Sequence, residues 1–230
     1  FLHFVSQIPV AKASGFRYSP IFNFKYPGLL KIFKFMSQRV VGASVYNINV
    51  MVVTAIASTL APGSIAIFSF ADNLQSFPIG IIGASFAIAS FPFMSKAWAD
   101  GAKNEFLKSF SSTFRQIIFL IAPLSILLFL LRSQIVGIIL SGGRFSWHDA
   151  ELTSAALGFF SFGIFAFALV PFLLRAFFSL QDVKTPTIIG LVYMAINFVF
   201  CVAFVKLFSF LGLPLAVSLS GIIYFSLLLI

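Results

Sequence analysis

The chain has 230 residues, of which 60% are hydrophobic and 9% are charged, with 33 phenylalanines and a mean hydropathy of +1.07. A water-soluble domain normally has about a quarter of its residues charged, because its surface faces water. The composition therefore excludes an ordinary soluble domain. It predicts an all-α, polytopic transmembrane helical bundle, in which each helix satisfies its own backbone polar groups within the hydrocarbon.

The formal net charge of +9 does not indicate a nucleic-acid-binding protein. The basic residues fall mainly at the ends of apolar runs and in one linker, the distribution that orients a protein in a membrane. No nucleic-acid partner is therefore expected. Cys201 is the single cysteine, which excludes an intrachain disulfide and a cysteine-based zinc site.

Apolar runs predict the membrane spans in chain order. Asp72 is the one charged residue between Arg39 and Lys96, a stretch too long for a single span of about 20 residues. The Pro-Gly pair at 62–63 divides it into two helices. The expected spans are 40–60, 64–94, 114–131, 152–180, 187–205 and a last one from 211 onward.

Both ends of the chain lead us to expect a piece of a longer protein, because it starts without methionine and stops within an apolar run. We expect the end of a preceding transmembrane helix at 1–10, a basic cytoplasmic linker at 11–38, and a C-terminal transmembrane lobe of about six helices at 39–230, the last one truncated. The linker has no acidic residue, so the positive-inside rule places it in the cytoplasm. Alternation then places 141–151 outside.

An ionisable side chain deep in a span is a candidate functional residue, because its burial costs a few kcal/mol or more. Asp72 lies about 12 Å from the start of its expected helix, near the bilayer midplane. A polar stripe at helical spacing is formed by Ser69, Asp72, Asn73 and Ser76, with Gln75 beside it.

Two other spans carry polar residues. The first span has Asn47, Thr54 and Ser58, with Arg39 at its cytoplasmic end, and the fifth has Tyr193 and Asn197. Such residues either line a cavity or hold the bundle together through interhelical hydrogen bonds, and we favour the structural role for the serines and Thr54. The candidate substrate-binding residues are Arg39, Asn47, Asp72, Asn73, Gln75 and Asn197.

Catalytic chemistry has little support in the sequence. His3 and His148 have no serine or cysteine arranged as a recognisable nucleophile. The segment 146–151 could suggest a metal site, but Ser146 followed by Asp149 is more typical of a helix N-cap. No glycine-rich phosphate loop or Walker lysine occurs, so the chain is not itself an ATP-driven motor. No catalytic residue, metal or cofactor is expected.

Two motifs go beyond composition. The first comprises Ala57-Ser58, Leu60-Ala61-Pro62-Gly63-Ser64 and Phe70-Ala71-Asp72-Asn73-Leu74-Gln75-Ser76-Phe77-Pro78-Ile79-Gly80. The second comprises Gly143-Arg144-Phe145, Asp149, Leu152-Thr153 and Arg175-Ala176-Phe177-Phe178-Ser179-Leu180-Gln181-Asp182-Val183-Lys184-Thr185-Pro186. In order, spacing and helix placement they resemble motifs of the MurJ (MviN) lipid II flippases, within the multidrug/oligosaccharidyl-lipid/polysaccharide exporter superfamily. The resemblance covers nearly the whole chain.

The resemblance implies a two-lobed exporter fold, of which this chain holds the second six-helix lobe, roughly helices seven to twelve. It also implies a transporter that flips lipid II, the undecaprenyl-pyrophosphate-linked precursor of peptidoglycan, across the bacterial cytoplasmic membrane by alternating access. One departure is Asn73, where the family usually has Arg.

Two alternatives remain open at this point, a related flippase for another polyprenyl-linked oligosaccharide and a transport-dead membrane scaffold of cell-wall synthesis. The expected partners are lipid II or a similar polyprenyl-pyrophosphate-linked glycan, membrane lipids and, for the scaffold, cell-wall synthesis proteins.

Overall fold

The computed structural model describes residues 9, 13, 15, 29–140 and 146–230, without the side chains of 30–32, 34, 35, 37–39, 41 and 43. The chain divides into two units, Phe1–Met36 and Ser37–Ile230, and the second unit holds nearly all of the described residues. Most of the expected helix end at 1–10 and of the linker at 11–38 lies outside the described residues, so both assignments stay predictions.

All regular elements in the described part of the chain are helical, which confirms the all-α prediction. They are α2 (Leu29–Ser58), α3 (Ser64–Pro78), the π-helical turn η1 (Ile79–Ala84), α4 (Ser85–Ala99), α5 (Lys103–Leu130), α6 (Arg132–Leu140), α7 (Trp147–Ser161), α8 (Ile164–Ser179), α9 (Lys184–Phe208), the 3₁₀ turn η2 (Ser209–Leu211) and α10 (Gly212–Leu229). The first helix begins at Leu29 rather than at residue 40, and α6 was not expected.

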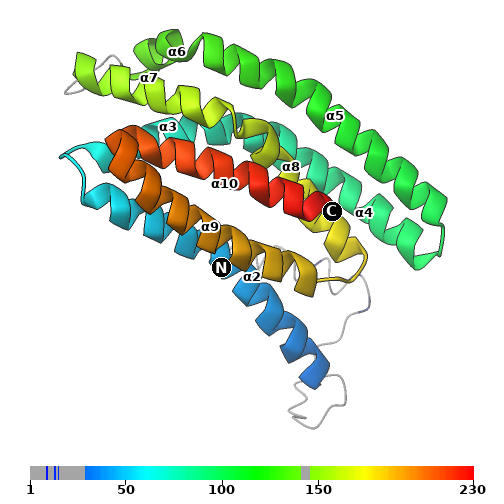
Figure 1. The fold of residues 1–230 in the computed structure, drawn as a ribbon. Coiled ribbons are helices and arrows are strands. Elements are labelled where there is room, and N and C mark those ends of the chain that lie inside the picture. The colour runs from blue at the N-terminus through cyan, green and yellow to red at the C-terminus, as the bar shows by residue number, and fades with distance from the viewer. Residues whose placement is uncertain (1–8, 10–12, 14, 16–28, 141–145) are drawn as a thin grey trace. The chain divides into compact units, whose positions relative to one another are not determined.

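Several of these helices are long and apolar enough to cross a bilayer. Within the described ranges they are Ser64–Ala99, Lys103–Leu130 and the segment Lys184–Leu229. The last has 46 residues, about 69 Å of helix against a hydrocarbon core of about 30 Å. Its two helices, α9 and α10, turn back at η2 and pack against each other (Figure 1), so the segment makes two crossings. The pair α7 and α8 makes one further span if counted together, with a bend of 51°.

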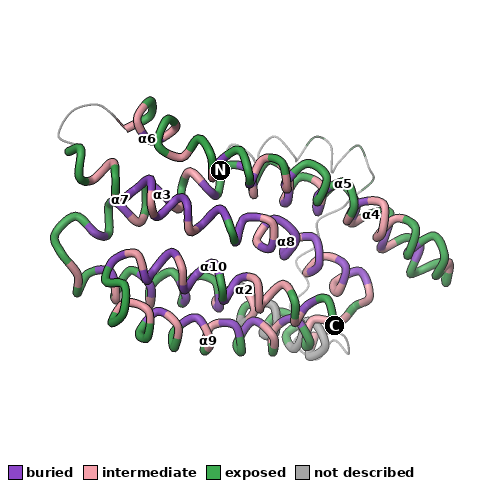
Figure 2. Tube along the Cα trace, turned by 45° about the horizontal axis from the view of Figure 1, so that its top comes forward, coloured by how far each residue is buried: buried purple, intermediate pink, exposed green. Residues whose placement is uncertain are grey.

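Helix α8 forms the centre of the second unit. It packs against η1, α4 and α5 on one side and α10 on the other (Figure 1). Figure 2 shows it as the most continuously buried helix, whereas the outer faces of α5 and α9 are exposed. Exposure of apolar side chains such as Phe119, at 78%, fits contact with lipid rather than water.

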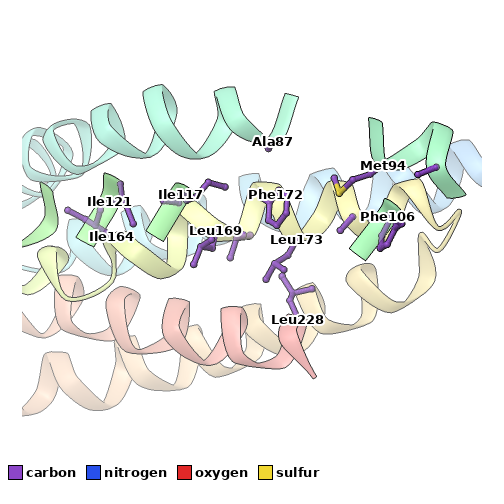
Figure 3. Packing of buried hydrophobic residues seen from close by; sticks show 14 of the residues in the cluster. Ala87, Met94, Phe106, Ile117, Ile121, Ile164, Leu169, Phe172, Leu173 and Leu228 are labelled. Carbon is purple, nitrogen blue, oxygen red and sulfur yellow. The ribbon is translucent and has the colours of Figure 1, made fainter. Parts of the chain in front are cut away.

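The core around α8 is made of large apolar side chains from neighbouring helices. Leu169 and Phe172 of α8 pack with Ile117 of α5, Met94 of α4 and Leu228 of α10 (Figure 3), and all five are almost fully buried. Burying such a side chain stabilises a fold by about 1.5–3 kcal/mol in water, but lipid tails are as apolar as these side chains. Close packing therefore holds this core together.

A glycine allows α8 to approach the π-helical turn. A Cβ atom at Gly83 would collide with the backbone of Ala168, so no other residue fits without moving one of the two helices. The turn follows Pro78, whose missing N–H removes one helical hydrogen bond. The close contact fixes η1, which joins the end of α3 to the start of α4, against the middle of α8.

Two helix ends are closed by capping hydrogen bonds. At the start of α7 the Asp149 N–H donates to the Ser146 hydroxyl at 3.1 Å and the Ser146 N–H donates to the Asp149 carboxylate at 3.1 Å. This capping box confirms the N-cap prediction. At the end of α8, Gln181 has a φ of 60°, and the N–H of Asp182 donates to the Phe177 carbonyl at 3.0 Å, as in a Schellman motif.

Candidate functional site

A cavity of about 390 Å³ lies within the second unit, between α2, α3, α8, α9 and α10. Its size is within the range of about 300–1,000 Å³ that is typical of small-molecule sites. Most of its wall is apolar. Its polar lining is supplied by Tyr46, Asn49, Asp72, Gln75, Ser76, Tyr193 and Tyr224. Three of these helices, α2, α3 and α9, are those on which the sequence placed its polar residues.

Asp72 and Gln75 form a pair on the cavity wall. They are one helical turn apart on α3, and the Gln75 Nε2 donates to the Asp72 Oδ1 at 2.8 Å. Gln75 is buried, with 3% of its surface exposed. Its Oε1 accepts no hydrogen bond from the described residues. A buried amide oxygen without a partner costs about 1–3 kcal/mol, so a ligand group or water that reached it would gain a hydrogen bond.

A second polar cluster joins α2, α9 and α10. The Ser220 hydroxyl donates to the Asn197 Oδ1 at 2.7 Å, and the Asn197 Nδ2 donates to the Asn49 Oδ1 at 2.7 Å. The Asn49 Nδ2 in turn donates to the Tyr193 hydroxyl at 2.9 Å. We call these four residues the asparagine network. Its hydrogen bonds run in one direction and end at the cavity, where Tyr193 lies.

The predicted site residues are distributed over several surroundings. Asp72 and Gln75 line the cavity, while Asn197 lies behind its wall in the asparagine network. Asn73 points elsewhere and lines a second, apolar cavity of about 460 Å³ with residues of α5 and α6. Asn47 is exposed on α2. The side chain of Arg39 lies outside the described residues. The role of all six in binding substrate stays a prediction.

Sequence reasoning missed Asn49, Tyr46 and Ser220. The polar face expected on α2 contained Thr54 and Ser58, but both hydroxyls are exposed and donate to carbonyls of their own helix. The buried face of α2 instead carries Val45, Asn49 and Val53. Their spacing of four residues was the available signal, because an asparagine between two buried valines on one helical face lies inside the bundle.

No metal site is built from acidic, histidine and cysteine side chains in the described ranges, where no group of three such residues occurs. What the cavity offers is hydrogen bonding. It has acceptors at Asp72 and Gln75, hydroxyls at Tyr46, Tyr193 and Tyr224, and apolar walls between them. This arrangement suits a ligand with both polar and apolar surface.

An all-helical bundle that crosses the membrane several times and encloses a cavity with a few polar groups defines a polytopic membrane protein. The family model described as "Lipid II flippase MurJ" matches residues 1–230. The chain belongs to the MurJ family.

Among its relatives, the chain is 30% identical over 227 residues to a probable lipid II flippase MurJ of Vibrio cholerae, covering 99% of this chain and 43% of that protein. It is 32% identical over 209 residues to one of Buchnera aphidicola subsp. Schizaphis graminum, covering 91% of this chain and 41% of that protein. The chain thus spans less than half the length of these relatives.

A solved structure described as lipid II flippase MurJ in an inward closed conformation has a similar fold. Its TM-score is 0.76 at 24% identity, over 99% of this chain and 47% of that one. At this identity the likeness is one of fold, and it agrees with the helical membrane bundle predicted from the sequence.

Proposed function

We propose that the full-length protein flips lipid II, the undecaprenyl-pyrophosphate-linked precursor of peptidoglycan, across the bacterial cytoplasmic membrane by alternating access. One observation supports the proposal in addition to family membership. A carboxylate, Asp72, and an unsatisfied buried amide, Gln75, lie on the wall of a cavity within the membrane-spanning bundle. Polar groups in a span are expensive and normally face a substrate pathway or another protein group.

The physics of the substrate supports a cavity mechanism. A head group of sugars, peptide and pyrophosphate cannot cross hydrocarbon unaided, because its polar groups would lose their hydrogen bonds with water. A transporter can replace those bonds within a cavity while the lipid tail stays in the membrane. Rocking of two lobes around the loaded cavity then exposes the head group first on one face and then on the other. Transport of this kind involves no covalent step, so the protein acts as a transporter rather than an enzyme.

Complementation tests the proposal. The full-length gene replaces the endogenous flippase in a depletion strain, and the lipid II exposed at the outer face of the inner membrane is measured. We expect exposure and growth to be restored. Normal membrane levels without lipid II exposure would contradict the proposal and would favour the transport-dead scaffold.

We also propose that the segment 141–151, which ends in the first turns of α7, faces the periplasm, because the basic residues lie mainly in other segments between the spans. Gly142→Cys in a Cys201→Ser background gives a single reactive cysteine in the chain. We expect a membrane-impermeant maleimide to label it in intact spheroplasts. Labelling only after the cytoplasmic face is opened would reverse the topology.

A further inference from the structure

The cavity wall on α3 is short of hydrogen-bond donors. Asp72 receives one hydrogen bond, from Gln75, although an ionised carboxylate accepts several. The Gln75 Oε1 receives none from the described residues, and its side chain is 97% buried, since 3% of its surface is exposed. The part of a ligand that meets this wall must therefore donate hydrogen bonds.

The wall on α9 has the opposite character. The Tyr193 hydroxyl already accepts a hydrogen bond from Asn49, so its own proton remains to be donated. The asparagine network holds this orientation, because the side-chain oxygen and nitrogen of both asparagines are hydrogen-bonded. A ligand group that meets Tyr193 must accept a hydrogen bond. Hydroxyl and acetamido groups both donate and accept.

Aromatic faces complete the lining. The rings of Tyr193 and Tyr224 are stacked, with centroids 4.6 Å apart and planes 18° apart, and Phe68 and Phe167 also line the cavity. Aromatic faces carry negative charge density and attract the weakly positive C–H groups of a ligand. Flat C–H faces together with hydroxyl and acetamido groups are characteristic of a sugar ring.

Charge argues against a phosphate at the same place. Among the described residues that line the cavity there is no lysine or arginine, and the one carboxylic side chain is Asp72. A pyrophosphate placed beside it would be repelled if both are ionised, and burial would strengthen the repulsion. Pyrophosphate sites in proteins instead use Arg, Lys or backbone N–H groups.

We propose that this cavity binds the sugar part of the lipid-linked substrate and leaves the pyrophosphate to groups outside it. The inference rests on the proposed function, which supplies the lipid-linked glycan. It assigns the hydrogen-bond acceptors Asp72 and Gln75 and the stacked Tyr193–Tyr224 pair to sugar recognition.

The test compares two ligands that differ in the sugars alone. Full-length protein is purified in detergent, and its affinity is measured for lipid II without its peptide and for undecaprenyl pyrophosphate, which has the same tail and pyrophosphate without sugars. The informative quantity is the ratio of the two affinities in one preparation, because a partly unfolded sample lowers the apparent binding of both ligands equally.

Gln75→Leu removes the orphan acceptor, and Tyr224→Leu removes one ring of the stacked pair. For each we expect the affinity for peptide-free lipid II to fall about tenfold, as for the loss of one or two buried contacts. Affinity for undecaprenyl pyrophosphate should stay within about twofold. Gln116→Leu and Phe198→Leu are matched controls at exposed positions on α5 and α9, and both ligands should bind them as they bind the parent.

Three outcomes would overturn the inference. Equal losses for both ligands in the cavity variants would mean that the cavity binds the pyrophosphate or the tail. Unchanged binding of both ligands, in variants of a parent that flips lipid II, would remove the sugar site and leave the proposed function standing. A parent that neither binds nor flips lipid II would refute the proposed function, and the sugar site with it.

Discussion

Two groups of polar side chains in the same bundle differ in how fully they are hydrogen-bonded. In the asparagine network, the amides of Asn49 and Asn197 each donate to one neighbour and accept from another. On α3, the only hydrogen bond that the structure gives between Asp72 and Gln75 is the one from the amide to the carboxylate, and the Gln75 Oε1 is left without a described partner.

This difference separates polar groups that stabilise the fold from polar groups that can bind a ligand. A network that satisfies its own groups holds helices together and offers little to a ligand except at its end, here Tyr193. A pair with spare acceptors gains stabilisation only when something enters the cavity. Substitutions in the network should therefore change stability, and substitutions in the pair should change transport.

The largest expected effect is on transport. Asp72→Ala should reduce lipid II flipping at least about tenfold, because it removes the carboxylate from the cavity wall. The membrane level should stay near that of the parent, since the residue is only partly buried and its hydrogen bond from Gln75 lies within α3. Flipping and membrane abundance are to be measured in the same cells. Flipping at the parent rate would contradict the distinction, because Asp72 and Gln75 would then have the same structural role as the asparagine network.

The next effect is on stability. Asn197→Leu should lower the free energy of unfolding by about 2 kcal/mol, because it leaves the Asn49 Oδ1 without a partner inside the bundle and removes the bond that joins Ser220 to α9. The Ser220 hydroxyl keeps its bond to the Val217 carbonyl of its own helix. Thermal unfolding of the purified protein in detergent measures this loss of stability. Thr54→Val is the matched control, because its hydroxyl is exposed and donates within α2. A variant that unfolds like the parent would show that the network does not hold α9 in place.

Asp182 lies outside the spans and, unlike Asp72, is a carboxylate that caps the start of a helix. Its carboxylate accepts from the N–H groups of Lys184 and Thr185 at 3.0 and 3.1 Å, where α9 begins. Partial burial alone would raise the pKa of Asp182. Hydrogen bonding from the Thr185 side chain and from the two N–H groups, together with the charge of Lys184, outweighs burial and holds the pKa below its usual range. Asp182→Ala should cost about 1 kcal/mol at neutral pH, as for other helix caps.

The sign of the pH dependence follows from that lowered pKa. The contribution of Asp182 is complete above the unfolded-state pKa of about 3.9 and is lost as the pH falls through the lower folded-state value. The difference in stability between the parent and Asp182→Asn should therefore change in this acidic window only, because asparagine caps a helix without titrating. A difference that changed between pH 6 and 8 would contradict this assignment.

The smallest effect is expected at Asn73. Asn73 is exposed and lines the apolar second cavity rather than the cavity that Asp72 lines. Asn73→Leu should therefore change the free energy of unfolding by less than about 0.5 kcal/mol and leave the rate of lipid II flipping unchanged. The same assays measure it. A strong loss of flipping would mean that the substrate contacts both faces of α3, which would enlarge the site beyond one cavity.

Sequence patterns were sufficient for the broad architecture. Low charge and long apolar runs predict membrane helices, and Ser146 with Asp149 predicts the start of α7, because both signals act within one helix. The direction in which a polar residue points depends on neighbouring helices. Asn47 and Asn49 are two positions apart, yet the first is exposed and the second is buried against α9. Within α2, the spacing of Asn49 with Val45 and Val53 is the available signal, and which face turns inward depends on the neighbouring helices.

The same limit applies to α3 and α8. Helical spacing groups Asn73 with Asp72, but the two side chains line different cavities. A single span was expected at 152–180, and the helix breaks there near Gly163, where a Cβ atom would press against Ser218 of α10. That contact is with a residue far along the chain, so the local sequence contains no sign of it.

The π-helical turn η1 also sets the phase of the long helix in which it lies. A π-helical turn corresponds to one residue inserted into an α-helix, and each residue of an α-helix advances the face by about 100°. Gly83, at the end of η1, is held against Ala168. Deleting one residue between Ile79 and Ala84 would therefore rotate the earlier part, α3, and turn Asp72 and Gln75 out of the cavity with their own sequence unchanged.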